Sequence, residues 1–207
     1  MIVISQQPEP ESFDDVVRKK GLKFLRDNEP PYNWTYHAYW RDSLPDLCRA
    51  YRSICAYCCH WIPNEQGSAS VDHFIPKSIT PDLAYEWANF RLASSKMNAK
   101  KRDYTDVVDP FEIQADTFIL LFPAMLVKPN PRFSGAEKKS LWDTIKRLDL
   151  NADESLVKAR LRWVLDYCDG HISFAYLQGK APFIAAEIQR QGLLASLQIL
   201  FARRSII

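Results

Sequence analysis

Residues 71–101 read VDHFIPKSITPDLAYEWANFRLASSKMNAKK, and they bring together an adjacent acid and imidazole, two asparagines and several lysines. Hydrolysis of a phosphodiester needs a water nucleophile, a base that takes its proton and a cation that neutralises the developing charge. Asp72 suits a hard divalent cation, and a neutral His73 suits proton abstraction near pH 7. The stretch therefore indicates metal-assisted cleavage of phosphodiesters.

Three short segments within and around this stretch have recognisable local patterns. Residues 71–74 predict a β segment, residues 89–93 are apolar on alternate positions, and residues 96–103 lack Gly and Pro and predict a helix. Neighbouring side chains on a strand point to opposite faces. We expect a twisted hairpin arm to aim both Asp72 and His73 into one cleft.

At these positions the chain resembles the HNH, or ββα-metal, endonuclease family. In that family a β-hairpin carries a catalytic His, a middle Asn fixes the loop, and a final His or Asn on a helix completes the metal site. The matching segments are CAYC at 55–58, VDHFIPK at 71–77, EWANFRLA at 86–93 and NAKK at 98–101. The resemblance implies an α+β chain, mainly helical, around a small ββα-metal motif.

The resemblance also implies a role for each matched polar residue. His73 would be the general base, and Asn89 would orient the loop that carries it through backbone hydrogen bonds. Asp72 and Asn98 would bind one Mg²⁺ or Mn²⁺, because a carboxylate and an amide oxygen with open water positions suit such a cation. Lys101, one helical turn past Asn98, would complete the catalytic set by meeting the scissile phosphate.

The cysteines depart from the family pattern. Many relatives hold a structural zinc between two CxxC pairs, of which Cys55 and Cys58 would be the first. The second pair would fall on Ser94 and Met97, and neither residue is a normal zinc ligand. The sequence therefore argues against a closed Cys₄ site, although a partial zinc site at the first pair stays open.

Nucleic acid is the substrate that the resemblance implies. The net charge is only +2, so any affinity for DNA must come from a local cluster. Positive side chains crowd around the motif, and we predict four of them as nucleic-acid contacts: Arg91, Lys96, Lys100 and Arg102. The competing interpretation is a solvated helix face. No segment resembles a base-reading module, so sequence specificity would come from a partner or from DNA shape.

Length and composition fit a folded chain, because 207 residues with 47% apolar side chains can bury a core. No apolar run is long enough for a membrane helix, and the amino-terminal residues lack the pattern of a secretory signal, so we expect a cytoplasmic protein without membrane contact. We predict a helical and aromatic support region at 1–54, the motif at 55–103, and a mostly helical subdomain at 104–207.

Within the last subdomain, helical periodicity covers residues 135–148 and 155–168, with Asn151 as a plausible N-cap for the second. Residues 182–202 predict one closing helix. The segments 108–111 and 142–163 resemble the region that follows the motif in HNH proteins of bacterial anti-phage defence, including those encoded beside ATPases of the Septu and retron type.

This second resemblance implies an effector endonuclease that acts on DNA, with an ATPase or other sensor protein as its partner. The alternative is a catalytically silent subunit that binds nucleic acid or an ATPase and keeps only a degenerate HNH motif. The incomplete cysteine pattern motivates that alternative.

Overall fold

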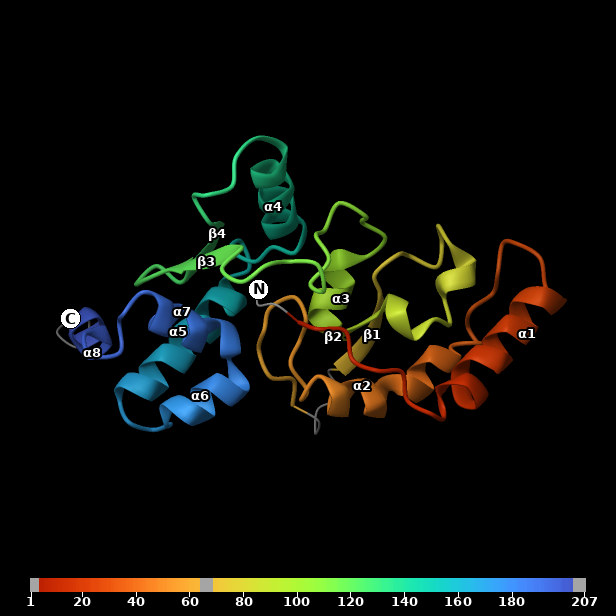
Figure 1. Ribbon diagram of the computed structural model, residues 1–207, viewed down its shortest axis with the longest axis horizontal. Coiled ribbons are helices and arrows are strands. Elements are labelled where there is room, and N and C mark those ends of the chain that lie inside the picture. Colours follow the sequence, from red (N-terminus) through yellow and green to blue (C-terminus); the bar gives the residue numbers. More distant parts are fainter. Residues whose placement is uncertain (1–3, 64–68, 203–207) are drawn as a thin grey trace. The chain divides into compact units, whose positions relative to one another are not determined.

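The computed structural model describes residues 4–63 and 69–202, and it shows helices together with two small antiparallel sheets (Figure 1). The expected α+β class is confirmed. The chain divides into two compact units, which we call the motif unit (4–56 and 62–105) and the helical unit (57–61 and the described residues from 106 on). The division between the two units falls after residue 105, whereas the sequence prediction set its boundary at 104.

The motif unit is built around one hairpin and one helix. Strands β1 (Ala69–His73) and β2 (Phe90–Ser94) pair antiparallel, with Asp72 opposite Arg91, and helix α3 (Ser95–Lys101) packs on both strands (Figure 1). Earlier and intervening elements of the unit are η1 (Asp14–Arg18), α1 (Lys19–Asp27), η2 (Tyr39–Ser43), α2 (Leu44–Ala50), η4 (Pro81–Leu83) and η5 (Trp87–Asn89).

Local chemistry explains where α3 begins and ends. Ser94 is its N-cap, and the Ser94 hydroxyl accepts a hydrogen bond of 3.3 Å from the backbone N–H of Met97. Met97 is buried, which anchors the first turn of the helix to the hairpin. The helix stops at Arg102, whose φ of 48° is incompatible with another helical residue.

Aromatic side chains from the amino-terminal part support the hairpin. Phe13 packs edge-on against Trp87 and Phe90, with ring centroids 5.6 and 5.8 Å away. Helix α1 approaches the η4–η5 segment at Gly21, where an added Cβ would lie 2.0 Å from Cγ of the fully buried Tyr85. Only glycine permits this contact between α1 and the segment that carries Tyr85.

The helical unit has a second small sheet, in which β3 (Phe118–Leu121) pairs antiparallel with β4 (Leu126–Pro129). Its helices are α4 (Gly135–Arg147), α5 (Glu154–Cys168), α6 (Phe174–Lys180), α7 (Pro182–Arg190) and α8 (Leu197–Ala202). In the described ranges no helix is long and apolar enough to cross a membrane.

Two sequence predictions for this unit are wrong. The single closing helix at 182–202 is two helices, because α7 ends before Gly192, which has a φ of 66°. Asn151 is not the N-cap of α5. Asp153 fills that position and accepts from the N–H of Ser155, whereas the Asn151 amide bonds both backbone groups of Val127.

Candidate active site

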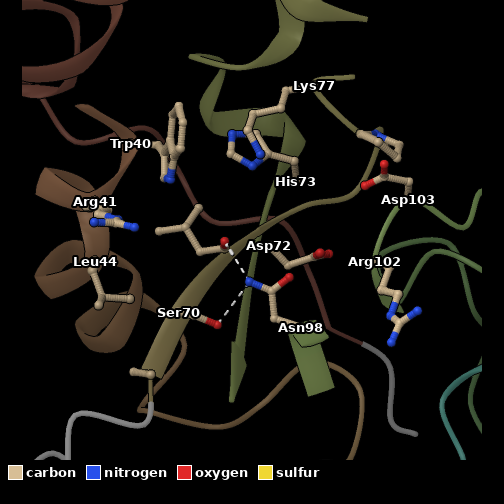
Figure 2. Close-up of a pocket in the computed structure, with 13 residues that line it drawn as sticks. Trp40, Arg41, Leu44, Ser70, Asp72, His73, Lys77, Asn98, Arg102 and Asp103 are labelled. Carbon is tan, nitrogen blue, oxygen red and sulfur yellow. Dashed lines mark hydrogen bonds between the residues drawn. The ribbon is translucent and has the colours of Figure 1, made fainter. Parts of the chain in front are cut away.

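A pocket of about 400 Å³ lies in the motif unit, where β1 ends beside α3 (Figure 2). Asp72 and His73 reach it from β1, and Asn98 reaches it from α3. Although Asp72 and His73 are neighbours on a strand, both line the pocket, as expected for a twisted hairpin arm. Four of the predicted site residues therefore line one pocket, namely Asp72, His73, Asn98 and Arg102.

His73 is held in one tautomer by the main chain. Its Nε2 lies 2.9 Å from the carbonyl oxygen of Ala84, and a carbonyl only accepts, so Nε2 carries the proton in the neutral ring. The lone pair is then on Nδ1. The ring packs edge-on against Trp40 and Phe90, with centroids 4.8 and 5.3 Å away, which limits its rotation.

Burial also keeps the His73 ring uncharged. Burial lowers the pKa of His73 to about 4. The hydrogen bond to Ala84 acts to raise this pKa, and the positive charges of Lys77 and Lys101 lower it further. Near pH 7 the imidazole is therefore neutral, and Nδ1 can accept a proton.

Asn89 ties together the loop that follows His73. Its Oδ1 accepts from the N–H of Ile75 at 2.8 Å, and its Nδ2 donates to the carbonyls of Ile75 and Leu83 at 3.0 Å each. Because Leu83 precedes Ala84, one buried amide links the loop after His73 to the segment that fixes the His73 ring. Asn89 thus holds the loop through backbone groups of Ile75 and Leu83.

The position of Lys101 corrects its expected role. Its side chain is 0% exposed, its Nζ donates to the carbonyl of His73 at 2.9 Å, and it lies 3.4 Å from Oδ1 of Asp72, which is 2% exposed. A lysine enclosed in this way cannot reach a phosphate in the pocket. It instead neutralises a buried carboxylate and fixes the end of β1.

Asn98 uses only half of its amide on the protein. Its Nδ2 donates to Oγ of Ser70 and to the carbonyl of Val71, at 3.2 Å each. Its Oδ1 has no hydrogen-bond partner among the residues that the structure describes, and it lies on the side of the Asp72 carboxylate (Figure 2). Asn151, in contrast, bonds the N–H and the carbonyl of Val127 at 2.8 and 2.7 Å. The Oδ1 of Asn98 therefore differs from that of Asn151 in having no partner among the described residues.

The oxygens of Asp72 and Asn98 are hard donors, and they fit the predicted Mg²⁺ or Mn²⁺. Within residues 4–63 and 69–202, no group of three or more His, Cys, Asp or Glu could hold a metal ion. A carboxylate and an amide alone would bind Mg²⁺ together with water and substrate phosphate, which is its usual mode in proteins.

Residues of the segments matched to the two zinc-binding cysteine pairs make hydrogen bonds within the protein. Cys55 is buried in the motif unit, and its sulfur accepts from the N–H of Ser94 at 3.4 Å. Ser94 in turn caps α3 through Met97. Cys58 belongs to the helical unit. Ser94 and Met97, which stand where the second cysteine pair would be, therefore form the hydrogen bond that caps the start of α3.

The predicted nucleic-acid contacts differ in exposure. Arg91 is 4% exposed, it donates to the carbonyls of Ala88 and Phe90, and its guanidinium lies 5.0 Å from the Phe74 ring centroid. The prediction for Arg91 is corrected, because this side chain is enclosed. Lys96 and Arg102 are exposed, Lys100 is half-buried, and Arg102 lines the pocket.

Three further charged residues of the pocket were not predicted, namely Arg41, Lys77 and Asp103. Lys77 lines it beside His73, and Asp103 lines it past the end of α3, where it accepts from the Ser78 hydroxyl at 3.1 Å. The signal for Lys77 was its place in the PK dipeptide just after the DHF tripeptide. Asp103 had no comparable signal.

Comparison of the chain with protein-family models gives no match, and comparison with curated proteins gives none either. Evidence for what the pocket does therefore comes from its own residues.

Proposed function

We propose that this chain is a metal-dependent HNH endonuclease that hydrolyses phosphodiester bonds of DNA. The observation that carries the proposal is the meeting of Asp72, His73 and Asn98 in one pocket, with the His73 ring fixed and neutral. A carboxylate and an amide oxygen can hold a hard cation, and a neutral imidazole can take a proton from water, which together suit single-metal hydrolysis.

In this function His73 takes a proton from water on Nδ1 while its Nε2–H stays donated to Ala84. That bond keeps the ring oriented and stabilises it as positive charge develops. Asp72 and Asn98 would hold the cation, which when bound supplies charge neutralisation at the phosphate. Asn89 and Lys101 are positioning residues, because they fix the loop and the strand end without entering the pocket.

Nicking of supercoiled plasmid tests the proposal. We expect cleavage with Mg²⁺, none with EDTA, and a loss of about 10³-fold in rate for His73→Ala, since a general base contributes roughly 10²–10⁴-fold. His171→Ala is the matched control, because that side chain is 66% exposed and lies in the other unit. Equal rates for wild type and His73→Ala, with both folded, would refute the role of His73.

One observation favours the silent alternative. Lys101 already neutralises Asp72, which weakens the attraction of that carboxylate for a cation. A silent subunit would bind labelled DNA in EDTA and would not nick plasmid with either Mg²⁺ or Mn²⁺. A magnesium-dependent nick that His73→Ala removes excludes this alternative.

We further propose that the endonuclease is the effector of an anti-phage defence system and has an ATPase or other sensor protein as partner. The resemblance of residues 108–111 and 142–163 to defence-associated HNH proteins supports this. The nicking assay should run faster with the product of the neighbouring gene than without it. An unchanged rate and no complex on size-exclusion chromatography would count against a partner encoded there.

A further inference from the structure

Lys77 lies on the loop after β1 and lines the same end of the pocket as His73 (Figure 2). Its ammonium nitrogen is 5.3 Å from the ring centroid of Trp40 and 5.9 Å from that of Trp34. Both distances are within the range of cation–π attraction. The two rings therefore hold the end of a flexible side chain in place beside the pocket.

The donors of Lys77 remain available to a ligand. Within the described part of the chain, its ammonium has these two ring contacts, no hydrogen bond and no carboxylate within 4.0 Å. Rings attract the cation but leave its three N–H donors unsatisfied. Lys101 is the opposite case, since it donates to a carbonyl and faces Asp72.

Electrostatics also favour an anion beside Lys77. The residue is half-buried, and burial lowers its pKa. The charges of Asp103 and Asp72 raise this pKa, and the charge of Arg41 lowers it. A partly desolvated ammonium gains most from a charged hydrogen-bond acceptor. A phosphate in the pocket would supply that acceptor next to the base, because the charge of Lys77 already reaches His73.

We propose that Lys77 is the residue that binds the scissile phosphate, a role that rests on the proposed endonuclease function. Trp34 and Trp40 keep the ammonium at the pocket, and its N–H groups donate to phosphate oxygens while His73 faces the attacking water. The phosphate contact that was expected of Lys101 thereby falls to Lys77, four residues after His73 in the chain.

The first test measures DNA binding without cleavage. Wild type, Lys77→Met, Lys77→Arg and Lys23→Met are titrated in EDTA with a short fluorescein-labelled duplex over a series of salt concentrations. Losing one phosphate contact lowers the slope of log Kobs against log salt by about 0.9. We expect that change for Lys77→Met alone. Lys23 is the matched control, because it is an exposed lysine of α1 that pairs with Asp27.

The second test measures nicking of plasmid with Mg²⁺. We expect Lys77→Met to lower kcat by about 10²-fold, as for removal of one donor to the transition state, and Lys77→Arg to restore most of it. If Lys77→Met does not fold in a thermal melt, Lys77→Gln replaces it, since it keeps most of the stem and loses the charge. The same outcomes then apply.

The outcomes separate this proposal from the proposed function. If wild type nicks DNA, while Lys77→Met equals Lys23→Met in both slope and kcat, the role of Lys77 is overturned and the endonuclease stands. If wild type never nicks DNA, yet only the Lys77→Met slope falls, the phosphate site stands and the endonuclease fails.

Discussion

Each unit of the chain has a histidine whose pKa is lowered to about 4 mainly by burial, His73 in the motif unit and His60 in the helical unit. Their surroundings differ. His73 donates to the carbonyl of Ala84 from Nε2 and lines a pocket. The buried Nε2 of His60 has no hydrogen-bond partner among the described residues. The positive charge of Arg160 also lowers the pKa of His60.

The difference teaches that a shifted pKa does not by itself identify a base. Burial produces the same shift in both rings, but only His73 has one nitrogen fixed by the main chain and a pocket lined by oxygen donors beside it. Geometry therefore supports the proposed role of His73 as the base, and its lowered pKa agrees with a ring that is neutral near pH 7.

The largest stability effect should come from the lysine that fixes the strand end beside His73. Lys101→Met removes the lysine partner of the buried Asp72, and breaking such a pair costs about 3–5 kcal/mol in the free energy of unfolding. Urea unfolding measures it. Lys96→Met, an exposed change on the same helix, should stay within about 0.5 kcal/mol. Equal values for the two variants would contradict the buried pairing.

The two histidines with lowered pKa also predict how the stability of the protein depends on pH. Below about pH 6.5 the unfolded chain protonates each histidine while the folded chain does not, so stability falls as the pH drops towards 4. Each ring contributes about 3 kcal/mol over that window.

His60→Leu separates the two contributions, because it should remove the His60 share of the pH dependence and leave the His73 share. Urea unfolding near pH 7 and near pH 4.5 measures the loss in each protein. The exposed His171 gives the control variant, His171→Ala. A wild-type stability that is flat across this window would show that neither ring is buried neutral.

The smallest effects should distinguish the two asparagines. Asn98→Ala should raise the Mg²⁺ concentration for half-maximal nicking by about tenfold, with a stability loss of about 1 kcal/mol. Asn151→Ala should leave the Mg²⁺ requirement unchanged and cost about 1–3 kcal/mol, because both backbone groups of Val127 lose their partner. If both variants needed more Mg²⁺, the effect of Asn98→Ala would come from its loss of stability and not from a lost ligand of the cation.

Local sequence pattern predicted the two strand segments of the hairpin and the helix after them, and the resemblance to the HNH family implied that Asp72, His73 and Asn98 share one site. Sequence pattern could not predict which basic side chains are enclosed by the protein. Arg91 and Lys77 are both basic residues near the motif, yet one stacks on Phe74 and bonds carbonyls while the other faces the pocket. That outcome depends on packing between segments distant in sequence.

The same limit applies to asparagine and to helix length. Asn151 looks like an N-cap because it precedes a helical pattern, but its amide is bound by a strand that lies earlier in the chain. The periodic apolar positions of 182–202 conceal a break at Gly192, because two short helices can keep one stripe of apolar residues.

The anchor of His73 has a consequence for how this site can be lost by mutation. The acceptor at Ala84 is a main-chain oxygen, so no side-chain replacement at that position deletes it. Loss of this anchor by mutation must instead come from a shift of the whole segment that carries Ala84. Gly21, distant in sequence and without a side chain, is where a single added methyl group would cause such a shift, by displacing the neighbouring Tyr85. A screen for inactive variants should therefore recover substitutions at Gly21 along with those in the pocket.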